Sequence, residues 1–467
     1  MLPGVALLEI FGFYLGEYNA SWHTLAHVCR RWRNTVFGSP RHLNLEIACS
    51  FGRPVRTALD IWPPLPIDIS SIGYGKKGGD VDNIVAALEH KDRVCKVNLW
   101  DVSNGELEKI LAVMQESFVA LTFLRLERNN YETSKVARGP DSFLGGSAPH
   151  LRNLTLDGIP IPSLGLQKLL LSANDLVDLS LRNIPHPVYF SPQAIVACLS
   201  ALTKLEYLEL TFLSPRSRPV RENRRLPPLT RSLLPALTNM TFGGVNEYLE
   251  DIVAQVDAPL LDTLSITFFH QLAFETLQLA QFIGRAPKLE GHNDARVVFS
   301  EKTVRVAFLL PTGEEEIKLA VSCKHPDLQL LSATQLCTLS FPQAFIPAVE
   351  HLYIVESKYS LRPSWENGFQ ILRSEWLRLL RPFTAVRDLY LSEKIVPLIA
   401  PALRELVGEG MTEVLPALQC LLLEGLHTSG PVMGAIGSFI AARQLSTHPI
   451  VASYWDRDED YWWDGED

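Results

Sequence analysis

The 467-residue sequence predicts an α/β fold that combines a short helical domain, a long array of strand–helix units and an acidic tail. Three observations support this fold class. A short apolar motif recurs through most of the chain, helix-like runs separate its copies, and the N-terminal segment has helical periodicity instead. We therefore expect a helical domain at 1–40, the array at 41–455 and the tail at 456–467.

Three short helices are expected within the helical domain. Pro3 suits the first turn of a helix, where its missing N–H has no intrahelical partner. Apolar residues of 22–29 fall at i, i+3, i+4 and i+7, and a third helix over 31–37 should end at Gly38. A core of this size leaves apolar surface exposed unless a partner covers it.

The array is defined by the motif L-x-x-L-x-L, in which the last alternating residues suit a short strand. Steps between five successive copies are 25, 29, 32 and 24 residues, which is the period of leucine-rich repeats. No unit can bury its apolar face alone, so stacking into a solenoid with a horseshoe form is expected. The copies are LRNLTL (151–156), LVDLSL (176–181), LEYLEL (205–210), LTNMTF (237–242), LDTLSI (261–266), LCTLSF (336–341), VEHLYI (349–354), VRDLYL (386–391) and LQCLLL (418–423), with weaker forms LNLEI, PIDIS, KVNLW and LTFLRL upstream.

One segment interrupts the repeat pattern. Residues 303–323 alternate apolar and polar positions on both sides of a Pro-Thr-Gly turn. This pattern predicts a β-hairpin inserted into the array.

Composition limits the classes of partner and compartment. The last twelve residues hold seven acids against one arginine, a net −6 of the total −9, so the rest of the chain is nearly neutral and gives no reason to expect nucleic acid. Seven scattered cysteines without metal-ligand spacing indicate free thiols and no metal site. With no basic n-region before Arg30 and no apolar stretch of spanning length, we expect a cytoplasmic or nuclear protein that does not use the membrane.

No motif in the sequence is typical of a catalytic site, so we expect no enzyme and no cofactor. GYGKKG (73–78) is a literal G-x-G-x-x-G between a strand-like and a helix-like run, with Asp101 downstream. However, Gly79 and Asp80 separate its third glycine from the helix, whereas a dinucleotide site needs that glycine inside the helix. A flexible loop is the favoured interpretation, and a nucleotide-dependent activity is the minority hypothesis.

Two charged segments allow more than one interpretation. RSRPVRENRR (216–225) is interpreted as an exposed loop between repeat strands, with an acidic ligand or nuclear import as the minority alternative. The C-terminal segment could be a disordered interaction tail, or Tyr454 and Trp455 could pack over the last repeat while the acids stay in water.

The N-terminal residues resemble a known family. LPGVALLEIF followed by WHTLAHVCRRWRNTVF is similar to the F-box pattern L-P-x-E-L-L-x-x-I-F, W-x-x-L and V-C-x-x-W, and covers residues 2–37. The acidic residue usual after Leu-Pro is replaced by Gly4 and Val5. An F-box before degenerate leucine-rich repeats resembles the fungal, basidiomycete-type F-box proteins.

The resemblance implies a non-catalytic substrate-recognition subunit of an SCF-type cullin-RING ubiquitin ligase. The F-box would dock on a Skp-type adaptor, and through it a cullin, while the repeats bind an unknown target protein. The runner-up is a repeat scaffold with no ligase connection, in which the helices only cap the array. The resemblance places these residues at the adaptor interface or its immediate support: Leu2, Pro3, Leu8, Ile10, Leu25, Val28, Cys29 and Trp32.

Target-binding candidates are the residues just before and between the last two apolar positions of the motif, because these should share the face opposite the helices. Aromatic residues at such positions are plausible hot spots. The preferred candidates are Tyr207, Glu209, His351, Tyr353, Asp388 and Tyr390, and the wider set adds Asn153, Thr155, Asp178, Ser180 and Arg182.

Overall fold

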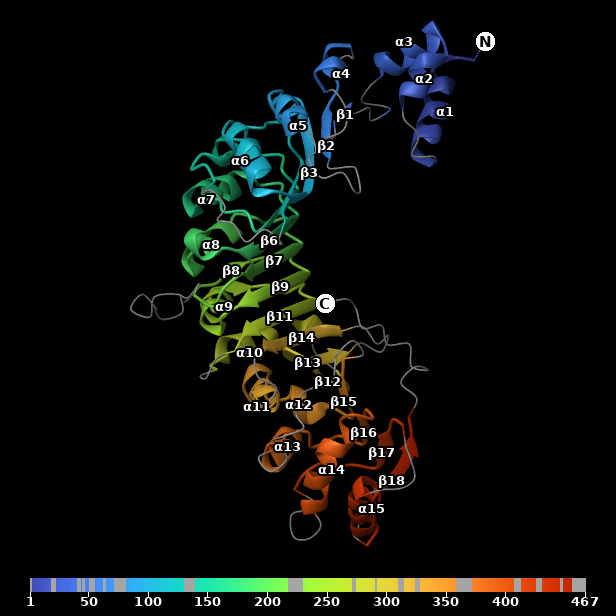
Figure 1. Cartoon of the computed structure of the whole chain (residues 1–467), viewed down its shortest axis with the longest axis vertical. Coiled ribbons are helices and arrows are strands. Elements are labelled where there is room, and N and C mark those ends of the chain that lie inside the picture. Colours follow the sequence, from blue (N-terminus) through green and yellow to red (C-terminus); the bar gives the residue numbers. More distant parts are fainter. Residues whose placement is uncertain are drawn as a thin grey trace. The chain divides into compact units, whose positions relative to one another are not determined.

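The computed structural model describes residues 2–17, 22–39, 43, 47–49, 55–61, 64–70, 81–129, 139–216, 230–270, 274–289, 292–309, 315–323, 328–357, 372–406, 413–425, 431–445 and 448–455. The chain divides into two compact units, Met1–Val188 and Tyr189–Asp467. Both are built from strands joined by helices, and their sheet pairings are mostly parallel (Figure 1). The fold class is therefore mixed α/β, as predicted.

The first unit opens with three helices and continues as alternating strands and helices. Its strands follow chain order, each pairing in parallel with the next from β1 to β6. Its helices are α1 (Gly4–Glu17), α2 (Trp22–Val28), α3 (Arg30–Gly38), α4 (Val55–Ile61), α5 (Val81–Leu88), α6 (Asn104–Val113) and α7 (Ser163–Ser172). Its strands are β1 (Ile47–Cys49), β2 (Ile67–Ser70), β3 (Val94–Val102), β4 (Phe123–Arg128), β5 (Asn153–Asp157) and β6 (Asp178–Ile184).

The second unit has strands in the order β7-β9-β11-β14-β13-β12-β15-β16-β17-β18, with β8 and β10 pairing separately. Its helices are α8 (Pro192–Leu199), α9 (Asn246–Val253), α10 (Leu277–Ile283), α11 (Gln329–Gln335), α12 (Phe345–Ala348), α13 (Leu372–Leu380), α14 (Val396–Glu405) and α15 (Pro431–Gln444). Its strands are β7 (Tyr207–Phe212), β8 (Ser232–Leu233), β9 (Asn239–Gly244), β10 (Val256–Asp257), β11 (Thr263–Phe269), β12 (Asp294–Phe299), β13 (Thr303–Leu309), β14 (Glu315–Ser322), β15 (His351–Glu356), β16 (Asp388–Leu391), β17 (Cys420–Leu423) and β18 (Val451–Tyr454).

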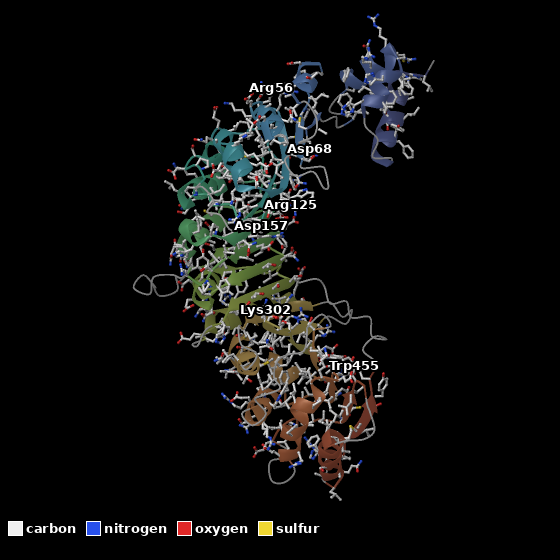
Figure 2. The ribbon with its side chains drawn as sticks, viewed as in Figure 1. Arg56, Asp68, Arg125, Asp157, Lys302 and Trp455 are labelled. Carbon is white, nitrogen blue, oxygen red and sulfur yellow. The ribbon has the colours of Figure 1, made fainter. Side chains whose placement is uncertain are left out.

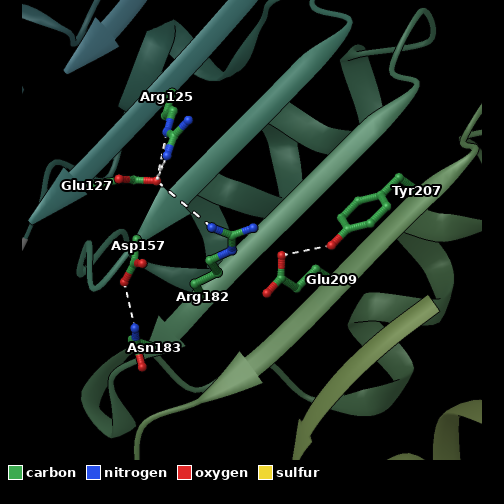
Figure 3. A network of polar contacts seen from close by, with 7 residues as sticks. All are labelled: Arg125, Glu127, Asp157, Arg182, Asn183, Tyr207 and Glu209. Carbon is green, nitrogen blue, oxygen red and sulfur yellow. Dashed lines mark hydrogen bonds and ion pairs between the residues drawn. The ribbon is translucent and has the colours of Figure 1, made fainter. Parts of the chain in front are cut away.

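The motif residues form the core between strands and helices. Leu154 and Leu156 of β5 are buried, whereas Asn153, Thr155 and Asp157 between and beside them are only half-buried. Successive strand residues point to opposite faces, so the leucines face the helices and the intervening residues face away. We call the face that carries these intervening residues the strand face. In Figure 3 it is turned toward the viewer, with the helices behind the strands.

Local sequence explains where several helices begin. At α6 the Ser103 hydroxyl accepts the Glu106 N–H (3.4 Å), and the Glu106 carboxylate accepts the Ser103 N–H (3.0 Å). This capping box satisfies two N–H groups that the first helical turn leaves without intrahelical partners. At α8 a single bond caps the helix, in which the Ser191 hydroxyl accepts the Ala194 N–H (3.3 Å).

The predicted hairpin forms two strands of the sheet. Strands β13 and β14 pair antiparallel, with a register shift between Phe308 and Leu309. Strand β14 also pairs in parallel with β11, and β13 pairs antiparallel with β12. The insertion therefore separates β11 from β12, which would otherwise be neighbours in the array.

One of the nine predicted repeat strands is wrong. LCTLSF is not a strand, because residues 336–340 continue helix α11 as a π-helical turn. No proline or glycine stands between the start of α11 at Gln329 and Pro342, and Leu336 and Leu339 also stand at a helical spacing. Strand β12, which the motif does not predict, has the sequence DARVVF and contains no leucine.

Candidate functional site

The three N-terminal helices have a small aromatic core. Phe11 lies 4.8 Å from Trp32 and Trp22 lies 5.7 Å from Phe37, measured between ring centroids. Leu25 is buried with them. Because these rings already hold the helices together, the remaining apolar side chains are not needed inside the domain.

Those remaining apolar side chains are exposed on α1, α2 and the residues before α1. The exposed fractions are 54% for Leu2, 72% for Val5, 48% for Ile10, 61% for Phe13 and 59% for Val28. We call these five residues the apolar surface. Single exposed apolar residues need no explanation, but several on so small a domain mark a binding surface.

The eight predicted adaptor-binding residues divide by exposure. Leu2, Pro3, Ile10, Val28 and Cys29 are exposed, Leu8 and Trp32 are half-buried, and Leu25 is buried. Leu25 and Trp32 therefore support the surface from within. Cys29 was expected to end the second helix, but it caps α3, where its Sγ accepts the Trp32 N–H (3.4 Å).

The arginines beside this surface hold the helices together. Arg31 donates to the Leu2 carbonyl, and Arg33 Nε donates to the Ala26 carbonyl (3.0 Å). These bonds connect α3 to the start of α1 and to the last turn of α2. Two of the three arginines in the CRRWR segment therefore make their contacts within the helical domain.

The strand face of the first unit carries a charged network (Figure 3). Arg125 Nε donates to Glu127 Oε1 (2.7 Å), and Arg182 Nη1 lies 4.0 Å from the same oxygen. One strand further along, Asn183 Nδ2 donates to Asp157 Oδ1 (2.7 Å). Arg182 belongs to the wider predicted set, whereas its partner Glu127 and the second cation on that carboxylate, Arg125, were not predicted as a site.

In the second unit, Tyr207 and Glu209 form a pair along β7. The Tyr207 hydroxyl donates to Glu209 Oε2 (3.2 Å), and Glu209 is buried (Figure 3). The pair stands next to β9, where Asn239 and Thr241 occupy the same positions of the neighbouring strand. These contacts orient a phenol and a carboxylate on the strand face.

The other four preferred candidates meet on β15 and β16. His351 pairs with Asp388 in register, and His351 Nδ1 lies 2.8 Å from Asp388 Oδ2. Two residues further along, the rings of Tyr353 and Tyr390 stack with centroids 4.1 Å apart. Six strand spacings of about 4.8 Å, roughly 29 Å, separate this group from the Tyr207 pair on β7. The six candidates therefore form two clusters.

Trp455, which Figure 2 labels, completes the tyrosine cluster. Its ring centroid lies 5.4 Å from that of Tyr390 and 6.0 Å from that of Tyr353, and its side chain is buried. Tyr454 beside it is exposed. Of the two interpretations of the C-terminal segment, packing over the array is observed for Trp455, which continues from β18.

Sequence reasoning missed Arg296 as a member of this cluster. Its guanidinium carbon lies 5.9 Å from the Tyr353 ring centroid, an arrangement that favours a cation over the ring face. Arg296 faces Tyr353 in the β12–β15 register. The alternation of Arg296 with Ala295 and Val297 is the signal that could have located it.

A pair of buried titratable groups lies next to Phe308 and Phe345. His292 Nε2 is 3.3 Å from Glu316 Oε2, and both side chains are buried. Burial lowers the pKa of His292 and raises the pKa of Glu316. Burial also raises the pKa of Asp294, which shares a row of the strand face with His351. These shifts favour the neutral forms, as expected where charge is removed from water.

Several predicted features lie outside the described residues, namely 73–78, 217–225 and 456–467. All seven cysteines are free, and burial raises the pKa of Cys337 to about 12 and of Cys49 and Cys198 to about 11. Within the described ranges, no group of three or more His, Cys, Asp or Glu side chains could hold a metal. Nor does any helix of those ranges combine the length and apolarity needed to cross a bilayer.

No protein-family model matches the chain, and no curated protein sequence matches it either.

Proposed function

We propose that this chain is the substrate-recognition subunit of an SCF-type cullin-RING ubiquitin ligase. Its N-terminal helices would be an F-box that docks on a Skp-type adaptor, and its strand–helix units would be degenerate leucine-rich repeats that bind the target protein. Such a subunit performs no chemistry. It raises the effective concentration of the target near a conjugating enzyme that other subunits supply.

The observation that carries the proposal is the apolar surface of the N-terminal helices. Its members Ile10 and Val28 occupy the F-box positions predicted to touch the adaptor, and both are exposed. The core of the domain is formed without them by Phe11, Trp22 and Leu25. An exposed apolar surface of this kind is stabilised by a partner that covers it.

The strand face supports the second half of the proposal. The Tyr207–Glu209 pair and the His351–Asp388 and Tyr353–Tyr390 contacts present aromatic and ionisable groups with fixed orientations. Ordered aromatic side chains lose little conformational freedom on binding, so they suit protein recognition. The target would be held there.

The test is direct binding of the full chain to a purified Skp-type adaptor, with Ile10→Asp and Val28→Asp as surface variants. Full burial of one such side chain contributes about 1.5–3 kcal/mol, so each variant should weaken binding by about tenfold to more than a hundredfold. Both residues are exposed, so the helices should keep their circular dichroism. Leu164→Asp on α7 is the matched control, because Leu164 is equally exposed but lies in the array.

Absence of adaptor binding by the wild-type chain would refute the ligase assignment. So would equal weakening by Leu164→Asp, since a general loss of apolar surface would then explain the effect. If the full chain captures no adaptor and deletion of residues 1–40 unfolds the array, the helices act as a cap of a repeat scaffold instead.

A further inference from the structure

Three cationic side chains gather on the strand face of the second unit. Lys318 of β14 and Arg296 of β12 both stand in register with Ala307 of β13, so they share one row of the sheet. Arg305 of β13 lies two residues from Ala307, so it points to the same face from the neighbouring row, in register with Ala320 and Val298. Helix α11 packs against the opposite face of β13 and β14. We call these three residues the cationic row.

The inserted hairpin is what brings this row together. Lys318 and Arg305 belong to the hairpin strands, and Arg296 lies on the strand that the hairpin separates from β11. Adjacent strands are about 4.8 Å apart, so the three side chains span about 10 Å. Asp294 and Glu316 lie two residues earlier on their strands, about 7 Å from the row, where burial raises their pKa and disfavours their charge.

The end of the described chain is anchored next to this row. Trp455 packs with Val298, Val355, Tyr353 and Leu309, and its backbone N–H donates to the Leu423 carbonyl (3.1 Å). Val298 stands in register with Arg305. The segment 456–467 therefore starts at a fixed point on the strand face, in line with the cationic row.

Length and charge of the last segment match this surface. It has twelve residues, which extend to at most about 40 Å, whereas six strand spacings from β18 to β14 amount to about 29 Å. It carries seven acids against one arginine, together with Tyr461, Trp462 and Trp463. Opposite charges attract strongly where the surface is partly buried, and the aromatic side chains of the segment can pack against the neighbouring tyrosines.

We propose that residues 456–467 dock on the cationic row of their own chain as an internal acidic ligand. Trp455 fixes the starting point, the carboxylates contact Lys318 and Arg305 above the buried Arg296, and the aromatic residues pack beside Tyr353 and Tyr390. An acidic partner that binds this part of the strand face has to displace the tail. The proposal does not depend on adaptor binding, because every residue it uses belongs to the second unit and the tail.

The test compares the full chain with a chain that ends at Trp455, using a fluorescein-labelled peptide of sequence DRDEDYWWDGED and fluorescence anisotropy. The shortened chain should bind the peptide saturably. The full chain should bind it at least about tenfold more weakly, because a tethered segment has an effective concentration of the order of millimolar. Raising the salt concentration should weaken binding to the shortened chain.

Site variants are made in the shortened chain. Lys318→Gln with Arg305→Gln should weaken peptide binding at least about tenfold. Arg378→Gln should leave it unchanged, because Arg378 is an exposed cation on α13 and pairs with Glu375 of its own helix. Circular dichroism verifies folding, and Lys318→Gln alone, with a half-buried side chain, serves if the double variant unfolds.

Five outcomes would overturn the proposal. These are no saturable binding to the shortened chain, equal binding to both chains, and a double variant that binds like its parent. The fourth is a full chain that dimerises while the shortened chain is monomeric by sedimentation, which would place the tail on a second copy. A peptide with serine at its three aromatic positions should bind more weakly, and equal binding would show unspecific attraction of acids in place of docking.

Discussion

Glu250 on α9 provides the sharpest test of how neighbouring units of the array hold one another. Its side chain is buried, and its two carboxylate oxygens accept the backbone N–H groups of Gln278 (2.9 Å) and Leu279 (2.8 Å) at the start of α10. Helix α10 has no side-chain cap of its own, since Thr276 makes no capping bond. Glu250 therefore supplies from the preceding helix the acceptors that α10 lacks.

The magnitude follows from these two bonds. A hydrogen bond to a charged group contributes about 1.5–3 kcal/mol, and removal of the acceptor leaves a buried N–H unsatisfied. Because the Gln278 N–H is only partly buried, we expect Glu250→Ala to lower the free energy of unfolding by about 3 kcal/mol rather than twice that value. Glu250→Gln keeps one acceptor oxygen and should cost about half as much.

The assay is urea denaturation combined with hydrogen exchange, because an array can lose one region before the rest unfolds. Amide protection should fall first at the beginning of α10. Glu275→Ala is the matched control, since Glu275 is exposed and precedes the same helix. The reasoning is refuted if Glu250→Ala costs no more than Glu275→Ala, or if Glu250→Gln is as damaging as the alanine.

Three further predictions concern strain, pH and thiol chemistry. Gly145→Ala should destabilise the first unit by about 1–3 kcal/mol in thermal unfolding, because Gly145 has φ +61° and a Cβ there would lie 2.7 Å from the Ser117 nitrogen; an unchanged Tm would contradict this. Burial lowers the pKa of His292, so the unfolded chain binds more protons below its usual value of 6.5 and stability should fall as pH drops from 7.5 to 5.5. His292→Gln should have a smaller fall over that range, and an equal one would show that His292 does not titrate as described. A thiol reagent should modify exposed Cys29 first, with Cys337 reacting only after unfolding because burial raises its pKa to about 12, which peptide mapping would verify or reject.

Strand positions could be predicted where the motif supplies its own periodicity. In β5 and β6 alternate leucines face the helices, so the period of two identifies both the strand and its exposed residues. The strand prediction for LCTLSF is wrong because its apolar spacing suits a helix as well as a strand. Residues 336–340 continue the preceding helix α11. Strand β12 was missed for the opposite reason, since valine and phenylalanine replace leucine there.

The motif predicted which face of the sheet each candidate site residue occupies, but not which residues it contacts. The motif places Tyr353 and Tyr390 on the strand face, and equal register on β15 and β16 then stacks them. The contacts of Trp455 could not be assigned from sequence, because its partners lie between 65 and 157 residues earlier in the chain and only the sheet order brings them near. Local patterns describe which side a residue faces, whereas contacts across strands depend on the order of the sheet.

The inserted hairpin has a consequence for the target binding that we propose for the strand face. Without β13 and β14 the Tyr207 and Tyr353 clusters would be four strand spacings apart, and with them the separation is six, about 29 Å. An extended peptide needs at least about nine residues to cross that distance. The intervening surface is the one that carries Lys318, Arg305 and Arg296. A target that contacts both clusters must therefore cross the cationic row, so acidic residues at the middle of such a segment favour binding, whereas a short or basic peptide can engage only one cluster at a time.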